Sequence, residues 1–380
     1  MKNTKDIKFM KEALSLALKR EGLTSPNPLV GAVIVKGNKV IGTGFHKKAG
    51  SPHAEIVAIK SAGQKAQGST LYINLEPCNH YGRTPPCVPE IIKAGIKRVV
   101  IGMQDPNPLV NGKGIEKLKS EGIDVQCGIL EENAKRINET YIKYITERVP
   151  FVVLKWAMSL DGKIATSTGD SRWISHPASR EFTHRLRGKF DAVLIGIETL
   201  LKDNPHLTTH GVGIKEPKRI IIDSKGRIPL DCNLLSPLFR SAKQSSGDKQ
   251  TAGGSIIIAT TNKISKEKIE GLGKLGGEII VVPSEKGRVS LKNLMVELAK
   301  REITSVLVEG GGNIIASFLE DGLADKFIAF ISPMIIGGKN AVSPVEGEGV
   351  KKIINAIPVH NFSTRKIGED IVVEGYLNTV

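Results

Sequence analysis

Cysteine, aromatic residues and long apolar runs are all scarce in this sequence. Four cysteines among 380 residues are too few for a disulfide scaffold and are typical of a reducing compartment. No apolar run approaches the roughly 18 residues of a membrane-spanning helix, and residues 1–22 predict a charged amphipathic helix, not a signal peptide. We therefore expect a cytoplasmic protein that has no membrane partner.

Acidic residues are outnumbered, because Lys and Arg total 54 against 39 Asp and Glu, which gives a formal net charge of +15. The excess is spread over both parts of the chain, as on a solvated basic surface. Proteins that bind single-stranded nucleic acid add aromatic side chains for base stacking, but aromatics make up only 4% of this chain. We expect no nucleic acid partner, and a modest positive field attracts phosphorylated small molecules.

The most informative pattern in the chain is His53-Ala54-Glu55, followed by Pro77-Cys78 and then Cys87. An imidazole and two thiolates can bind Zn²⁺ and leave its fourth position open to water, whose pKa then falls to about 7. Zinc nucleobase deaminases carry this arrangement as His-x-Glu and Pro-Cys-x-x-Cys, although here a longer loop separates the cysteines. The pattern predicts a zinc site with His53, Cys78 and Cys87 as ligands, and Glu55 as a catalytic proton carrier.

Two other interpretations of these residues stay open. They could be ordinary buried residues, or they could form a structural zinc site, for which Cys127 is distant in sequence and His80 is nearer. A closed site would leave Glu55 without a role. The local sequence favours metal binding, because Ser51 predicts a helix N-cap just before the histidine and another helix is expected at 88–94. Helix N-termini stabilise anions such as thiolates.

The chain is long enough for two domains, which we expect at 1–147 and 148–380. Strands of the first are expected at 30–36, 39–45, 70–75, 98–103 and 123–127, and helices at 113–122 and 131–146. Strands of the second are expected at 151–157, 192–195, 219–222, 255–259, 278–282, 305–308 and 327–331, with helices at 178–187, 291–301 and 313–321. This alternation predicts α/β domains, the second with a mostly parallel sheet. The polar, glycine-rich residues 241–254 predict a mobile loop.

Two glycine-rich stretches are candidate nucleotide-binding turns. Residues 271–276 spell GxGxxG, but a helical segment precedes them and a strand follows, the reverse of the dinucleotide fingerprint, so a helix-ending turn is the better interpretation. Residues 310–312 are all glycine and have the right order, between the strand 305–308 and the helix 313–321. Glycines let a ligand approach the backbone, and a helix N-terminus binds phosphate. A turn without a ligand remains the alternative.

Taken together, these motifs strongly resemble the bifunctional deaminase–reductases of riboflavin biosynthesis. The matching stretches cover nearly the whole chain: PNPLVG at 26–31, HAE at 53–55, LEPC at 75–78, GRTPPC at 82–87, DPNP at 105–108, SLDG at 159–162, DNPHLT at 203–208 and VEGG at 308–311. The resemblance implies a cytidine-deaminase-like N-terminal domain and a C-terminal domain of the dihydrofolate-reductase type. It also implies Zn²⁺ and NADPH as cofactors. The first domain would hydrolyse the 2-amino group of 2,5-diamino-6-(5-phosphoribosylamino)pyrimidin-4(3H)-one. The second would reduce the ribosyl side chain of 5-amino-6-(5-phosphoribosylamino)uracil to ribityl.

The resemblance also implies roles for individual residues of the chain. The positions that bind NADPH would be Ala157, Trp173, Thr199, Asp203, Gly311 and Gly312. The positions that bind substrate would be Lys155, Ser171, Arg187, Leu207, His210 and Glu309. Apart from the resemblance, Asn27 and His80 are candidates for contacts to the base or phosphate in the deaminase pocket, with a structural role as the alternative. The family usually has arginine where this chain has His210. Histidine makes fewer bonds to phosphate than arginine does, and it titrates near neutral pH.

Two rival functions are compatible with parts of the sequence. One is a nucleobase or tRNA deaminase with a non-catalytic second domain, which the long cysteine spacer and the matching second domain oppose. The other is a zinc-stabilised nucleic-acid-binding protein without catalysis, in which Glu55 would be dispensable. We expect a homo-oligomeric enzyme that acts on a small phosphoribosyl pyrimidine.

Overall fold

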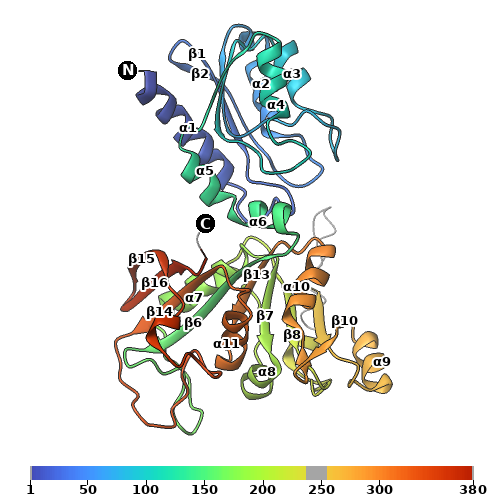
Figure 1. Ribbon diagram of the computed structural model, residues 1–380, viewed down its shortest axis with the longest axis vertical. Coiled ribbons are helices and arrows are strands. Elements are labelled where there is room, and N and C mark those ends of the chain that lie inside the picture. Colours follow the sequence, from blue (N-terminus) through green and yellow to red (C-terminus); the bar gives the residue numbers. More distant parts are fainter. Residues whose placement is uncertain (1, 237–254, 379–380) are drawn as a thin grey trace. The chain divides into compact units, whose positions relative to one another are not determined.

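The computed structural model describes residues 2–236 and 255–378. The chain divides into two compact units, Met1–Val149 and Pro150–Val380 (Figure 1). The loop expected at 241–254 lies outside the described residues. Among the residues that are described, no helix combines the length and the apolar composition that crossing a membrane requires.

The first unit is built on a five-stranded sheet in the order β2-β1-β3-β4-β5. Its strands are β1 Gly31–Lys36, β2 Lys39–Phe45, β3 Thr70–Leu75, β4 Arg98–Met103 and β5 Asp124–Cys127. β1 pairs antiparallel with β2 and β3, whereas β3, β4 and β5 are parallel. The helices are α1 Lys2–Leu18, α2 Ala54–Ala62, α3 Val88–Lys93, α4 Lys113–Ser120, α5 Glu131–Ile137 and α6 Glu139–Glu147.

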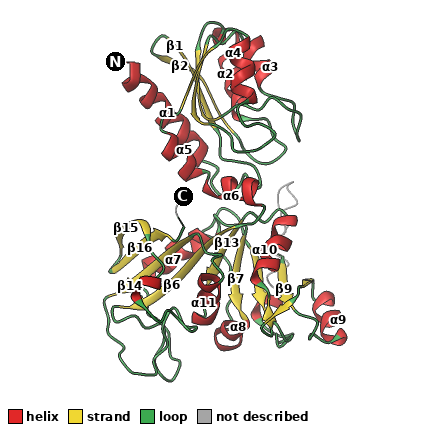
Figure 2. Cartoon of the chain, in the orientation of Figure 1, coloured by secondary structure: helices red, strands yellow, loops and turns green. Residues whose placement is uncertain are grey.

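Alternating side chains of β1 bury both faces of this sheet, as the two-residue period of a strand requires. Ala32 and Ile34 pack into a cluster that includes α2, α3 and α4. Val33 and Val35 pack into a second cluster with α1 and α5. The sheet is therefore the middle layer between two layers of helices (Figure 2).

Glycine lets α2 lie close against β2. A Cβ atom added to Gly44 would lie 2.2 Å from the carbonyl oxygen of Ala54, and one added to Gly42 would lie 2.5 Å from that of Ala58. Any larger residue at these positions would push the helix away from the sheet. The close approach fixes the first turn of α2, which carries Glu55 and follows His53.

The second unit contains a nine-stranded sheet in the order β10-β9-β8-β7-β13-β6-β14-β16-β15. Its strands are β6 Phe151–Ser159, β7 Ala192–Gly196, β8 Lys218–Ile222, β9 Ile256–Thr260, β10 Gly277–Val281, β13 Ser305–Glu309, β14 Lys326–Ser332, β15 His360–Ile367 and β16 Asp370–Tyr376. A separate hairpin joins β11 Ser284–Glu285 to β12 Arg288–Val289. The helices are α7 Pro177–Arg187, α8 Ile197–Asp203, α9 Lys266–Lys274, α10 Leu291–Lys300 and α11 Gly312–Glu320.

Within the nine-stranded sheet, the neighbouring strands β10, β9, β8, β7, β13, β6 and β14 are all parallel, as the alternation of helices and strands predicts. Successive residues of the central strands are buried on opposite faces: Val193 joins the cluster that includes Leu186 of α7, and the neighbouring Leu194 is also fully buried. Parallel strands place their carboxyl ends at one edge of the sheet, where ligands bind in α/β folds.

Three details differ from expectation. The helix expected at 131–146 breaks at Asn138, whose side chain accepts a hydrogen bond from the Leu29 amide at 2.8 Å and donates one to the Leu29 carbonyl at 3.1 Å. The N-cap of α2 is His53 and not Ser51, which instead closes a turn with Lys48. The hairpin of β15 and β16 was not expected, because almost every β15 side chain is exposed and shows no apolar alternation.

Candidate active sites

Three side chains from three separate segments of the first unit converge on one point. His53 precedes α2, Cys78 follows β3, and Cys87 is the N-cap of α3. Their donor atoms all lie within 4.8 Å of one another. Nδ1 of His53 is 3.2 Å from Sγ of Cys87 and 3.5 Å from Sγ of Cys78. Two free thiols and one imidazole at these separations are a donor set that suits Zn²⁺.

The surroundings orient the histidine toward the thiols. Nε2 of His53 lies 3.0 Å from Oγ1 of Thr84, so the tautomer that carries its proton on Nε2 leaves Nδ1 free for a metal ion. The ring of His46 packs edge-on against His53 with 5.4 Å between centroids. Nε2 of His46 in turn lies 3.0 Å from Nδ2 of Asn27. Asn27 therefore belongs to the wall of this site.

Glu55 is a buried carboxyl beside the three candidate metal ligands. Its side chain is buried, and its Oε2 atom has no hydrogen-bond partner among the described residues. Burial raises the pKa of Glu55 to about 7, although the neighbouring His53 opposes the rise. A buried carboxyl with a free oxygen beside a metal-ligating set is suited to carry a proton. His80 also has a buried, unpartnered atom, Nδ1.

A second buried carboxylate, Glu76, holds the loop after β4 against the cysteine segment. Its oxygens accept four backbone N–H groups, from Asp105 at 3.2 Å, Gly112 at 2.9 Å, Gly114 at 2.9 Å and Ile115 at 3.2 Å. Glu76 lies directly before Pro77 and Cys78, so these bonds fix the segment that carries a metal ligand. The sequence analysis did not identify this role, because its partners lie far along the chain.

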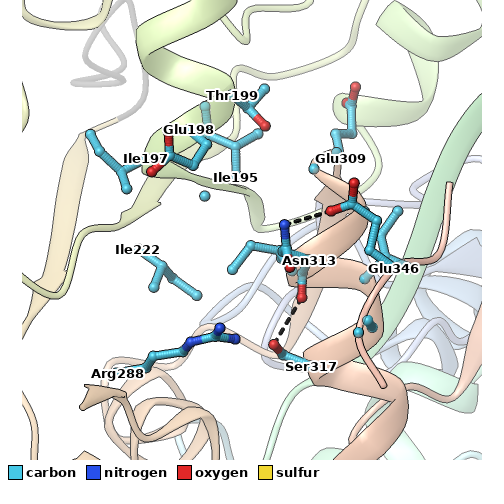
Figure 3. A pocket seen from close by; sticks show the side chains of 18 of the residues that line it. Ile195, Ile197, Glu198, Thr199, Ile222, Arg288, Glu309, Asn313, Ser317 and Glu346 are labelled. Carbon is cyan, nitrogen blue, oxygen red and sulfur yellow. Dashed lines mark hydrogen bonds between the residues drawn. The ribbon is translucent and has the colours of Figure 1, made fainter. Parts of the chain in front are cut away.

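The second unit contains a cavity of about 1210 Å³ at the carboxyl ends of β6, β7, β8 and β13 (Figure 3). This volume exceeds the roughly 300–1,000 Å³ that is usual for small-molecule pockets. Ten of the residues expected from the resemblance line the cavity: Lys155, Ala157, Ser171, Arg187, Thr199, Asp203, Leu207, Glu309, Gly311 and Gly312. The fold therefore brings together residues that are far apart in the sequence, such as Lys155 and Gly312, which are 157 positions apart.

Two expected residues do not line this cavity. The Trp173 side chain is 66% exposed and stacks on Arg180, whose guanidinium lies 4.5 Å from the ring centroid. His210 is exposed, and its ring packs against that of His184 with 4.3 Å between centroids. Burial, together with the charge of Arg187, lowers the pKa of His184 to about 4. The sequence analysis did not identify His184.

A buried ion pair occupies one wall of the cavity. Nε of Arg187 donates to Oε1 of Glu309 at 2.6 Å, and Nη2 donates to Oε2 at 3.0 Å. Nζ of Lys155 is 3.9 Å from Oε2 of Glu309. Burial alone would raise the pKa of Glu309, but the charges of Arg187 and Lys155 outweigh it and bring the pKa to about 2. Burial lowers the pKa of Lys155, and Glu309 opposes this.

The glycine turn between β13 and α11 forms another wall. Gly310 and Gly311 have φ values of 103° and 74°, which lie in the region that only glycine adopts readily. A Cβ atom on Gly311 would lie 3.1 Å from Oγ1 of Thr199. Asn313 in the first turn of α11 donates to Glu346 (Figure 3). These glycines lead directly into the first turn of α11, and a helix N-terminus is a common phosphate-binding position.

Comparison with known proteins places the chain in a family. A family model described as the RibD C-terminal domain matches residues 150–373, and one described as the cytidine and deoxycytidylate deaminase zinc-binding region matches residues 3–103. The chain is 44% identical over 369 residues to the riboflavin biosynthesis protein RibD of Aquifex aeolicus, covering 97% of each protein. The chain belongs to the RibD family. It is also 36% identical to the RibD protein of Escherichia coli, over 96% of this chain and 97% of that protein.

Solved structures agree with this placement. The Thermotoga maritima diaminohydroxyphosphoribosylaminopyrimidine deaminase/5-amino-6-(5-phosphoribosylamino)uracil reductase is 36% identical, with a TM-score of 0.83 and full coverage of both chains. Acinetobacter baumannii RibD, form 2, is 34% identical, with a TM-score of 0.84 and the same coverage. The resemblance and the fold class expected from the sequence are therefore confirmed. The rival of a deaminase with an unrelated, non-catalytic second domain is not favoured, because the RibD relatives match along the full chain.

Proposed function

We propose that this RibD family member catalyses two successive steps of riboflavin biosynthesis. The first unit hydrolyses the 2-amino group of the diaminopyrimidinone that carries a 5-phosphoribosylamino group. The second unit uses NADPH to reduce the ribosyl group of the deaminated product to ribityl. The observation that carries the proposal is the convergence of His53, Cys78 and Cys87 beside the buried carboxyl of Glu55, whose Oε2 atom has no hydrogen-bond partner among the described residues.

His53 Nδ1 and the two thiolates would hold Zn²⁺, and Thr84 would fix the histidine ring. When bound, zinc is a Lewis acid that makes water nucleophilic near neutral pH. Hydrolysis breaks the bond between the ring carbon and the amino group and forms a carbonyl whose oxygen comes from water. One proton of that water would go to the ring nitrogen and the other to the amino group, which leaves as ammonia. Glu55 would carry these protons through its carboxyl. Asn27 and His80 are proposed to contact the pyrimidine or its ribose phosphate.

In the second unit, bound NADPH would supply the hydride for C1′ of the opened ribose, and a proton from solvent would convert the former ring oxygen into a hydroxyl. Thr199, Asp203, Ala157 and the turn at 311–312 are proposed to bind the cofactor. Trp173, which follows the lining residue Ser171 by two positions, is proposed to join them. The protein's own contribution is position, because hydride transfer needs two carbons held in contact more than it needs a strong acid.

Substrate binding in the second unit is assigned to Ser171, Arg187, Leu207 and Glu309, which share the cavity with Lys155. The buried ion pair leaves part of the Arg187 fork directed to the carbonyl of Thr208 at 2.8 Å. The ammonium of Lys155 lies 3.9 Å from Glu309 in this cavity, and we assign Lys155 to the ribose that is reduced. His210 is assigned a weaker phosphate contact than an arginine would make.

Three further proposals concern the whole protein. The residues 1–147 and 148–380 act as separate deaminase and reductase domains, supported by hydrophobic clusters that each lie within one unit. The four free cysteines support a cytoplasmic location. A homo-oligomer is supported by apolar side chains exposed on β15 and in the segment before it in the sequence, with Ile353 at 89%, Ile354 at 86% and Phe362 at 66% exposure.

The test is product analysis by mass spectrometry after incubation of the full-length protein with the diaminopyrimidinone phosphate. Without NADPH, we expect ammonia and the uracil derivative that retains its ribosyl group. With NADPH, we expect the ribityl derivative and one NADP⁺ for each molecule reduced. A protein that deaminates but never oxidises NADPH would support the rival of a single-function deaminase. A protein that releases no ammonia would contradict the proposal for the first unit.

A further inference from the structure

One end of the reductase cavity is basic. Beside the glycine turn after β13, the lining carries no lysine or arginine from residues 310–317. Near the end of β8 and the β11–β12 hairpin, the cavity lining is rich in cations: Lys225, Arg227, Lys286 and Arg288. The Arg288 side chain extends from the hairpin into the cavity, toward Ile222 and Ser317 (Figure 3). The two regions therefore differ in the charge that they offer a ligand.

Hydrogen bonds hold the hairpin beside the loop that follows β8. The backbone N–H of Val289 donates to Oγ of Ser224 at 3.0 Å. The carbonyl oxygen of Ser224 accepts from Oγ1 of Thr261 at 2.7 Å. The first of these bonds joins the residue after Arg288 to the residue before Lys225, and the second fixes Ser224 against the segment after β9. Two cations from distant parts of the sequence are thus brought to one end of the cavity.

The cations at this end differ in whether a carboxylate pairs with them. Arg227 is paired with Glu198 at 2.7 Å and approaches Asp223 at 4.0 Å. For Arg288 and Lys225, by contrast, no side-chain ion pair is found within residues 2–236 and 255–378. Glu285 also lines this end, where it accepts a hydrogen bond from Oγ of Ser290 at 3.2 Å. The balance leaves a positive end with two cations available to an anion.

The opposite side of the cavity is acidic and would repel a second phosphate. Its lining includes Glu320, Asp321 and Glu348 at the C-terminal end of α11, whereas Glu346 lies at the start of this helix and accepts a hydrogen bond from Asn313. An elongated ligand with a pyrophosphate at the glycine turn and one further phosphate would therefore place that phosphate at the β8 end. The sheet order β8-β7-β13 puts two strand spacings, about 10 Å, between these places. One ribose and the side-chain reach of lysine or arginine can span that distance.

We propose that Arg288, assisted by Lys225, binds the 2′-phosphate on the adenosine half of NADPH and makes the reductase unit discriminate against NADH. This inference rests on the proposed reductase function and assigns its cofactor preference to named residues. The planar guanidinium of Arg288 can donate two parallel hydrogen bonds to a phosphate, whereas Lys225 adds a point charge. NADH lacks that phosphate and gains nothing from either side chain.

The experiment measures dissociation constants of NADPH and NADH for the full-length protein by equilibrium titration without pyrimidine. The variants are Arg288→Ala, Arg288→Lys and Lys225→Ala. The matched control is Lys292→Ala, because Lys292 is exposed on the adjoining helix α10 and does not line the cavity. Losing one charge-assisted contact should weaken NADPH binding about 10- to 100-fold, while NADH binding and the control stay unchanged. Arg288→Lys should recover part of the loss.

Adenosine 2′,5′-bisphosphate and adenosine 5′-monophosphate separate this phosphate from the rest of the cofactor. The first should compete with NADPH in the wild type and lose that ability in Arg288→Ala, whereas the second should compete poorly with both. Equal loss of NADPH and NADH, or no loss of either, would overturn the inference while leaving the reductase proposal intact. A wild type that binds NADPH tightly but reduces no ribosyl substrate would instead contradict the proposed function. A wild type that binds neither nucleotide would overturn both.

Discussion

Replacing Glu309 by glutamine should destabilise the second unit far more than replacing an exposed glutamate does. Glu309→Gln removes the carboxylate that pairs with Arg187 and neighbours Lys155, and both cations lose their anionic partner. The site is buried, since the Glu309 side chain is only 8% exposed. The pKa of Glu309 is about 2 against an ordinary value of 4.5. A shift of roughly 2.5 units corresponds to on the order of 3 kcal/mol. Loss of one partner of a buried pair typically costs a similar ~3–5 kcal/mol.

The pH dependence gives this prediction a sign. A carboxyl whose folded pKa is depressed contributes stability that is present above its unfolded pKa, about 4.5, and is lost as the pH falls through the folded value of about 2. The difference in unfolding free energy between wild type and Glu309→Gln should therefore be largest near pH 7. It should shrink progressively between about pH 5 and pH 2, since the wild-type carboxyl becomes protonated there.

The assay is urea unfolding followed by tryptophan fluorescence. Trp156 and Trp173 are the only tryptophans in the chain and both lie in the second unit, so the signal reports on that unit alone. The control is Glu278→Gln, which removes an ion pair to Arg301 at 2.7 Å from a glutamate that is 43% exposed, and should cost under about 1 kcal/mol. Equal costs for the two variants at pH 7 would refute the reasoning about the buried pair.

Two further predictions concern positioning. Glu76→Gln should raise the hydrogen-exchange rates of the Gly112, Gly114 and Ile115 amides and lower the free energy of unfolding by about 2–4 kcal/mol. The reason is that the new side-chain amide nitrogen would face N–H donors that bind a carboxylate in the wild type. Unchanged exchange at these amides would show that Glu76 does not hold the loop. Gly311→Ala should weaken NADPH binding at least about 10-fold and cost about 1–3 kcal/mol, since φ is 74° and the new Cβ would lie 3.1 Å from Thr199 Oγ1. Gly273→Ala in α9 has open space around its Cβ and should be neutral or stabilising in thermal unfolding, so a similar loss there would contradict the turn-specific explanation.

The sequence was sufficient for most of the fold because its strands are continuous apolar runs. Residues 219–222, 256–259 and 305–308 are rich in Ile and Val, and each forms a buried parallel strand. β15 escaped prediction because its edge position leaves its side chains exposed, so no alternation marks it. The break at Asn138 was missed because its partner, Leu29, is 109 residues away. Local patterns do not show such contacts.

The site residues also divide into those that local sequence patterns reveal and those that depend on contacts between distant segments. The metal-ligating set was predictable because His-x-Glu followed by Pro-Cys and a further cysteine is typical of zinc deaminases, and the structure brings all three side chains together. The functions of Glu76 and Arg288 depend on which loops meet in space, so no spacing in the sequence marks them. Trp173 and His210 were expected in the reductase site from resemblance alone, and they lie outside the lining of its cavity. Their roles stay predictions.

The most direct test of the account compares zinc content and ammonia release in wild type and Glu55→Gln. Glu55 is not part of the proposed ligand set of His53, Cys78 and Cys87, so elemental analysis should find one zinc per chain in both proteins. The variant should release ammonia at least about 100-fold more slowly because its amide cannot carry the proton. Cys87→Ser should lose zinc and activity together. Absence of zinc from the freshly isolated wild type, or full ammonia release by Glu55→Gln, would contradict the central claim.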